Sequence, residues 1–510
     1  MRRIALYGLI ALLAGLYLLP FMRVLSGATD EGLYVYASQE AAEGAIPGRD
    51  FVQENPPGAY YWLALFFRLF GTSMMTARVV LLLTGVASVL VLVHLARRIG
   101  SNGLFAGTFF LITCIPLTPI NSPHYDSNLF ALLAFAAFLK GTDSLLEGEP
   151  RQWPFVVAGT LAGWVSCILQ QKGFLFLVAF CATLLVLHSR RGLRGCLLMA
   201  ISYASVLVAE LVPYVMWGAL PDLFYSNVVL PLSSYQGVNQ VVYGYPLWTV
   251  WFPKVFAHVE ANASALVTGP TLLLMSLPFL LLLAAPLAVA ALAYWHRYRV
   301  FDNRWIPYWI TAYAMLLSEL HRQDLSHFRN ACILLVLLFF AICDRIGTRW
   351  LRFAAIAVVL GAIMVGATDL AGTLSLNHPV TTRRGTLLAK ARDPVLEFLI
   401  SHTQPGDYAF VYPYSPAYYF LADLRNPTPL NVIVDQRRNR LIEQAITGLD
   451  TKKPRYAIAD TKLLGDHIRT LFPNFRPPDP KDRVIDRYID AHYHQVGFED
   501  GFRILERNSD

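Results

Sequence analysis

A succession of long apolar runs, separated by short charged segments, constrains the fold of this chain more than any other feature. An apolar run of about 18 residues can cross the hydrocarbon core of a bilayer as a helix. The first run extends from Ile4 to Phe21, and others follow as far as residue 371. Together they predict a mainly α-helical, polytopic membrane protein with about eleven spans, at residues 4–21, 77–95, 104–120, 127–140, 154–170, 173–188, 196–217, 268–294, 305–320, 328–343 and 351–371.

The basic residues indicate how these spans are oriented. With 55% hydrophobic and 15% charged residues, the chain is too apolar for an ordinary soluble protein. Its net charge of +7 does not indicate nucleic-acid binding, because the basic residues mark the ends of apolar runs. Alternate loops are rich in them: Arg2/Arg3, Arg97/Arg98, Lys140/Arg151, Arg190/Arg191/Arg194, Arg297/Arg299/Arg304 and Arg345/Arg349/Arg352. The positive-inside rule therefore predicts a cytoplasmic N-terminus, with both long loops (23–76 and 218–267) and the C-terminal region outside.

The composition changes after about Leu376, which predicts a membrane portion over residues 1–375 and a small soluble α/β domain over residues 376–510. This tail is richer in charge and proline, and no stretch of it could cross a membrane. We expect a helix around 396–400, a turn at 405–407, buried strands at 408–412, 431–434 and 456–459, a crossover helix at 442–449 between the last two strands, and a terminal hairpin around 499–501.

Acidic residues gather in the first outer loop, directly after the first predicted span. Asp30 and Glu31 lie a few residues past the membrane exit, and Glu54 lies two residues before Pro56-Pro57. A lipid-linked substrate presents its head group at this interface, and a carboxylate there can accept a proton from a hydroxyl group. Two simpler alternatives stay open, because Asp30 could be a helix N-cap and Glu54 a solvated loop acid.

The same segment resembles the GT-C membrane glycosyltransferases, and within them the group of protein O-mannosyltransferases and lipid A aminoarabinose transferases. The matching positions are Asp30/Glu31, Gly44, Asp50, Glu54-Pro56-Pro57 and Ala77-Arg78, followed by Asp126, Lys172-Gly173 and the segment 321–327. The chain departs from the group's pattern at Asn55, where many relatives have Lys, and at Gly58, where many have Leu. Over residues 1–375 the resemblance implies a GT-C fold.

The resemblance also implies an activity. Such an enzyme transfers a sugar, here mannose- or arabinose-like, from a polyprenyl-phosphate carrier to a hydroxyl of a lipid, glycan or protein, outside the plasma (bacterial inner) membrane. A single displacement would invert the anomeric centre. Asp30 matches the position of the catalytic base, while Glu31 would orient the loop or bind the acceptor, and Glu54 would bind donor or acceptor.

Cationic and polar residues at predicted outer helix ends are candidates for binding the lipid phosphate, which leaves with negative charge. They are Arg78, His124, Asp126, Lys172, His321, Arg322 and His327. Arg78 and Lys172 could instead snorkel to the interface, and Asp126 could cap a helix. The segment 321–327 could also be a polar turn. A less favoured alternative is that it binds a divalent metal through His321, Asp324 and His327. No cofactor is otherwise expected.

Two other functions compete with a glycosyltransferase. A transporter or flippase of a lipid-linked saccharide would also have many spans, but such proteins often show internal repeats and broken helices near the bilayer midplane. Neither feature is evident here, and the polar clusters gather on the predicted outer side. A structural scaffold is the third alternative. The expected partners are therefore a polyprenyl-phosphate sugar, a hydroxyl acceptor and membrane lipids, with no nucleic acid.

Overall fold

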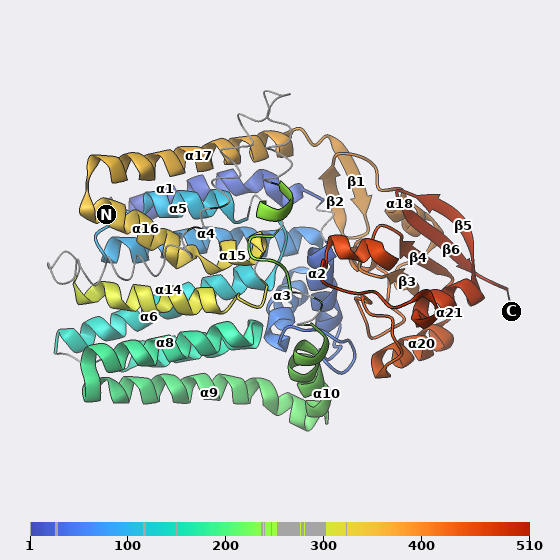
Figure 1. The fold of residues 1–510 in the computed structure, drawn as a ribbon, viewed down its shortest axis with the longest axis horizontal. Helices are drawn as coiled ribbons and strands as arrows, with labels where there is room; N and C mark the ends of the chain where they lie inside the picture. The colour runs from blue at the N-terminus through green and yellow to red at the C-terminus, as the bar shows by residue number, and fades with distance from the viewer. Residues whose placement is uncertain are drawn as a thin grey trace.

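In a computed structural model of the chain, long helices run side by side and a small α/β region lies at one end of the bundle (Figure 1). The structure describes residues 2–25, 29–115, 119–148, 151–235, 240–245, 247–251, 302–322 and 324–509, together with residues 238, 276 and 280.

All but one of the predicted spans correspond to helices. These helices are α1 (Arg2–Leu18), α4 (Met74–Arg98), α5 (Leu104–Thr113), α6 (Pro123–Leu146), α7 (Trp153–Ile168), α8 (Gln170–His188), α9 (Leu193–Met216), α14 (Ile306–Leu317), α16 (Ile333–Ile346) and α17 (Arg349–Leu374). The remaining prediction, 268–294, lies outside the described residues except for residues 276 and 280. Short elements accompany these helices: η1 (Leu19–Arg23), η2 (Ser189–Gly192), α10 (Leu220–Phe224), η3 (Tyr225–Val229), η4 (Pro231–Tyr235), η5 (Leu247–Trp251), η6 (Asn303–Trp305) and α15 (Leu325–Ala331).

Fewer helices than predicted meet a strict test of length and apolarity for a membrane span. Among the described residues five do, or six if α15 and α16, which meet at an angle of 58°, form one broken span. One of the five is the 47-residue stretch Gln170–Met216, which consists of α8, η2 and α9, and α8 and α9 lie side by side in Figure 1. The described chain is thus a multi-pass membrane protein.

The first outer loop contains two helices, α2 (Thr29–Ala42) and α3 (Pro57–Phe70). A helix at the position of α2 was implied by the alternative that Asp30 caps a helix, and Asp30 lies in the first turn of α2, whereas α3 was not predicted. Pro57 is the first residue of α3, where the missing amide hydrogen costs nothing, and Gly71 ends the helix with φ 87°. The two helices pack against each other, with the rings of Tyr34 and Tyr60 6.2 Å apart. They form a platform at one end of the bundle.

The C-terminal region contains a hairpin, β1 (His378–Thr382) with β2 (Gly385–Ala389), and a four-stranded sheet of order β3-β4-β6-β5. The sheet strands are β3 (Ala409–Tyr412), β4 (Tyr456–Asp460), β5 (Tyr493–Glu499) and β6 (Phe502–Arg507). The helices are α18 (Pro394–His402), α19 (Ala417–Leu421), α20 (Arg440–Lys452) and α21 (Val484–His492), with η7 (Gly465–Thr470) and η8 (Pro480–Asp482).

Most predictions for this region are confirmed, and one is wrong. The helix at 396–400, two strands and the terminal hairpin occur as expected. The strand predicted at 431–434 does not form, because its polar groups find irregular partners: Ile433 N donates to Pro413 O at 2.8 Å. As a result α20 connects the parallel strands β3 and β4.

The C-terminal region is docked on the α2–α3 platform through one shared apolar core. That core includes Tyr34 and Leu63 of the platform together with Leu399 and Phe420 of the C-terminal region. Hydrogen bonds join the same surfaces, with Asn426 N donating to the Tyr36 hydroxyl of α2 at 2.8 Å. This contact places the α/β region directly over the helix ends that carry the candidate residues.

Candidate active site

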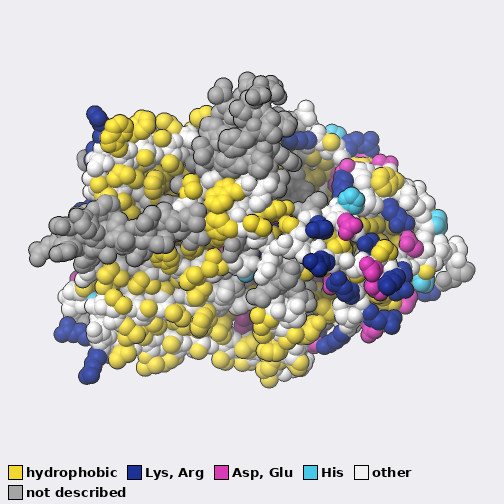
Figure 2. Space-filling view, in the orientation of Figure 1, with side chains coloured by type: hydrophobic (Ala, Val, Ile, Leu, Met, Phe, Trp, Pro, Cys, Tyr) yellow, Lys and Arg dark blue, Asp and Glu magenta, His cyan; other side chains and the backbone are white. Residues whose placement is uncertain are grey.

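The candidate residues lie at one end of the helical bundle. Asp30 and Glu31 begin α2, Arg78 lies in the first turns of α4, His124 and Asp126 begin α6, Lys172 begins α8, and the segment 321–327 joins α14 to α15. These helix ends face the C-terminal region (Figure 1). Lys and Arg side chains also gather at the opposite end of the bundle (Figure 2). Described loops that the charge pattern assigns to the cytoplasm, such as the one between α8 and α9, lie at that end.

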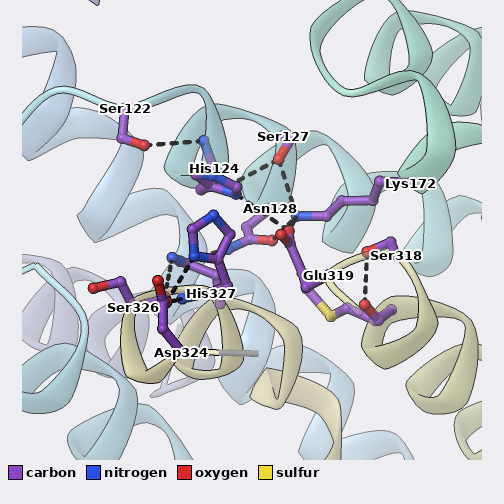
Figure 3. A network of polar contacts seen from close by, with 12 residues as sticks. Ser122, His124, Ser127, Asn128, Lys172, Ser318, Glu319, Asp324, Ser326 and His327 are labelled. Carbon is purple, nitrogen blue, oxygen red and sulfur yellow. Dashed lines mark hydrogen bonds and ion pairs between the residues drawn. The ribbon is translucent and has the colours of Figure 1, made fainter. Parts of the chain in front are cut away.

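A buried carboxylate, Glu319, lies at the centre of the polar network drawn in Figure 3. It follows α14 and its side chain has no exposed surface. Lys172 Nζ lies 2.8 Å from its Oε1, and His124 Nδ1 lies 3.2 Å from the same oxygen. Glu319 was not among the residues predicted from the sequence, although a single carboxylate at the outer end of a predicted span is the kind of signal that could have identified it.

Lys172 is fully buried and its three protons are all used within the protein. Besides Glu319, its Nζ donates to Asn128 Oδ1 at 2.9 Å and to Ser127 Oγ at 3.2 Å. An ammonium group has three donors. Lys172 therefore does not snorkel to the interface, and it has no proton left for a phosphate in this arrangement.

Asp324 organises the segment that precedes α15. It is the N-cap of that helix, accepts a hydrogen bond from His327 N at 3.0 Å, and lies 2.7 Å from His327 Nδ1. Arg322 Nε donates to its other oxygen at 2.5 Å. Burial alone would raise the pKa of Asp324, but the neighbouring His327 and Arg322 outweigh it and hold the pKa below its usual range.

Three histidines line the same network. The rings of His124 and His327 lie 4.9 Å apart, and those of His321 and His327 lie 5.3 Å apart. Burial lowers the pKa of His321 to about 4, with His327 adding to the effect, so His321 is neutral at physiological pH.

The predicted metal ligands do not form a set, which corrects that part of the sequence analysis. Within the described ranges, the residues with metal-ligand spacing are His124, Glu319 and His327, whose ligand atoms all lie within 4.8 Å of one another. Asp324 instead binds His327 and Arg322, and α15 begins only at Leu325, so no continuous helix aligns His321 with Asp324. Two imidazoles and a carboxylate suit a divalent cation, but Lys172 already supplies a positive charge to Glu319.

Asp30 and Glu31 have different environments although they are adjacent. Asp30 is exposed, and its Oδ1 accepts a hydrogen bond from the hydroxyl of Tyr414 in the C-terminal region. Glu31 is buried: its Oε2 lies 2.7 Å from Arg78 Nη2, and its Oε1 accepts from Asn121 N at 2.8 Å. Of the two carboxylates, Asp30 is the one open to a substrate.

The remaining candidates are held in packing contacts. Arg78 has no exposed surface and also donates to Val24 O at 3.0 Å. Asp126 is buried, and its carboxylate accepts hydrogen bonds from the Tyr34 hydroxyl at 2.8 Å and the Thr84 hydroxyl at 3.3 Å. The N-cap of α6 is Ser122, so Asp126 does not cap this helix.

Glu54 is half-buried, in a segment whose carbonyl groups accept hydrogen bonds from the Asn227 side chain.

Fold and site together define a class of protein: a multi-pass membrane protein with a polar, histidine-rich cluster beneath a small α/β region. Residues 54–217 match the family model described as dolichyl-phosphate-mannose-protein mannosyltransferase. A comparison with curated protein sequences found no significant match.

Solved structures of an archaeal oligosaccharyltransferase share the fold at low sequence identity. An oligosaccharyltransferase from Archaeoglobus fulgidus, in complex with Zn and sulfate, has a TM-score of 0.53 at 12% identity, covering 91% of this chain and 69% of the other. The same organism's oligosaccharyltransferase AglB, with an inhibitory peptide and a dolichol-phosphate, has a TM-score of 0.51 at 12% identity, covering 90% and 70%. ArnT from Cupriavidus metallidurans, bound to undecaprenyl phosphate, covers 99% and 98% at 14% identity with a TM-score of 0.47.

These findings confirm the resemblance drawn from the sequence. The chain has the fold of the archaeal oligosaccharyltransferase, and its residues 54–217 are similar to the dolichyl-phosphate-mannose-protein mannosyltransferases.

Proposed function

We propose that the chain transfers a mannose- or arabinose-like sugar from a polyprenyl-phosphate carrier to a hydroxyl of a lipid, glycan or protein acceptor, with inversion, on the outer face of the plasma (bacterial inner) membrane. One observation carries this proposal. An exposed carboxylate, Asp30, and a cluster containing Arg322, His124 and His327 occupy the same end of the bundle, where the C-terminal region contacts both Asp30 and Arg322. Such a transfer needs both a base and a cationic phosphate site.

The proposed reaction is a single displacement. The Asp30 carboxylate accepts the proton of the acceptor hydroxyl while that oxygen attacks the anomeric carbon from the face opposite the phosphate. The bond between the anomeric carbon and the phosphate oxygen breaks, and its electron pair leaves with the lipid phosphate. Glu31 is less suited to act as the base, since both of its oxygens already accept from Arg78 and Asn121.

The departing phosphate needs donors that can reach solvent or the membrane surface. Arg322, His124 and His327 keep 16%, 21% and 17% of their side-chain surface exposed, and we assign the phosphate to these three residues. Lys172 acts indirectly in this proposal, by holding Glu319 in place beside His124.

The activity can be tested without knowing the acceptor. Membranes that contain the chain, supplied with undecaprenyl-phosphate mannose or arabinose and an envelope extract from the source organism, should release free undecaprenyl phosphate. Release should depend on the extract, because the extract supplies the hydroxyl. If neither donor released undecaprenyl phosphate but the intact donor moved across the membrane, the result would favour a flippase over a transferase.

The topology belongs to the same proposal. We assign about eleven spans to residues 1–375, a cytoplasmic N-terminus, and an extracytoplasmic domain to residues 376–510. The charge pattern of the loops supports this orientation.

A reporter fused after Asp510 tests this orientation. An enzyme that is active only in the cytoplasm should be silent there, and one that is active only outside should give signal. The same cytoplasmic reporter fused after Arg98, in a loop assigned to the cytoplasm, is the positive control. A strong cytoplasmic signal at the C-terminus would overturn the outer-face site.

A further inference from the structure

The C-terminal region contacts both parts of the proposed active site. A small apolar cluster in this region contains Tyr414, Ile468, Phe472 and Phe475, with Leu33 of α2 packed against it. Leu33 lies three residues after Asp30, so this cluster is anchored next to the proposed base.

Tyr414 is the member of the cluster that contacts the base. Its hydroxyl donates to Asp30 Oδ1 across 384 residues of sequence, and 9% of its surface is exposed. A phenol that donates to one carboxylate oxygen restricts the rotation of that carboxylate and leaves the other oxygen to face a substrate.

Phe472 connects the same cluster to the phosphate site. Its ring lies 6.2 Å from that of Tyr414 and 5.6 Å from the Arg322 guanidinium carbon. Arg322 Nη2 also donates to Leu471 O at 3.2 Å. A guanidinium over an aromatic ring with a fixed carbonyl partner is held in one orientation.

We propose that Tyr414 is a positioning residue for Asp30, and that the pair Tyr414–Phe472 sets the spacing between the base and Arg322. This inference rests on the proposed function of Asp30 and extends it to the C-terminal region, which thereby completes the active site. A base aligned with its substrate in advance avoids the entropic cost of finding that alignment during the reaction.

The test compares Tyr414→Phe with its parent in the release of undecaprenyl phosphate from undecaprenyl-phosphate mannose or arabinose. We expect kcat to fall about tenfold, the size expected when one hydrogen bond to a charged group is lost, with KM for the donor nearly unchanged. Tyr418→Phe is the matched control, because that hydroxyl also donates to a carboxylate, Asp393, at 3.3 Å, but within the C-terminal region. It should leave kcat unchanged.

A second comparison separates positioning from a general structural effect. In an Asp30→Asn background, Tyr414→Phe should cause no further loss of kcat, because the base that it positions is gone. An equal loss in both backgrounds would overturn the inference while leaving Asp30 as the base. Near-normal turnover of Asp30→Asn would overturn both the base assignment and this inference. Phe472→Leu should weaken binding of undecaprenyl phosphate severalfold, and unchanged binding would remove Phe472 from the proposal.

Discussion

Replacing Asp30 by asparagine should slow sugar transfer at least about a hundredfold while the folded protein still binds undecaprenyl phosphate. Asparagine has nearly the same shape, and its amide oxygen can still accept the hydrogen bond from Tyr414, so the docking of the C-terminal region should survive. Only the ability to accept a proton is lost. The measurement is release of undecaprenyl phosphate from the sugar-linked donor, alongside binding of the free lipid phosphate.

The matched control is Asp50→Asn, in the same outer loop. Asp50 binds Arg49 at 2.7 Å and accepts from Ile46 N at 2.8 Å, and it has no proposed role in transfer. Its substitution should leave transfer within about twofold, since an exposed ion pair contributes little. If Asp30 were only a helix cap, Asp30→Asn would cost at most about 1 kcal/mol of stability and transfer would continue at a normal rate. That result would make Glu54 the next candidate for the base.

The helices could be predicted because long apolar runs leave few alternatives inside a membrane protein. A run such as 77–95 must satisfy its backbone hydrogen bonds internally, and α4 forms there as expected. The helix α3 was missed because fourteen residues are too few to indicate a span. The strand predicted at 431–434 was wrong because local apolar character does not show whether a partner strand is available.

The candidate site could be predicted only in part, because its contacts join distant segments. The histidine-rich segment 321–327 stood out in the sequence, but Glu319 did not, and its partners Lys172 and His124 lie on α8 and α6. Likewise, the pairing of Glu31 with Arg78 depends on how the bundle brings the start of α2 to the first turns of α4. Spacing along the chain identified polar residues at helix ends, whereas the choice of partners depended on the packing of the bundle.

The buried pair of Lys172 and Glu319 leads to the second large effect. Lys172→Met should lower the free energy of unfolding by about 3–5 kcal/mol, because it leaves the Glu319 carboxylate buried without its cation. Lys140→Met is the control: Lys140 is exposed and lies over Trp153 at the opposite end of the bundle, so its loss should cost well under about 1 kcal/mol. Unfolding of the detergent-solubilised protein, followed by heating or by denaturant, measures the difference.

The double variant Lys172→Met/Glu319→Gln decides what this lysine does. The pair is electrically neutral as a unit, so removing both charges should restore most of the stability that either single variant loses. All three Lys172 protons are directed at Glu319, Asn128 and Ser127, so we also expect the double variant to bind undecaprenyl phosphate nearly as well as the parent. Suppose instead that Lys172→Met binds the lipid phosphate poorly, and that the double variant regains stability but not this binding. That result would show that the ammonium group itself binds the phosphate. The pair would then have to open when the donor enters, and Lys172 would join Arg322 in the phosphate site.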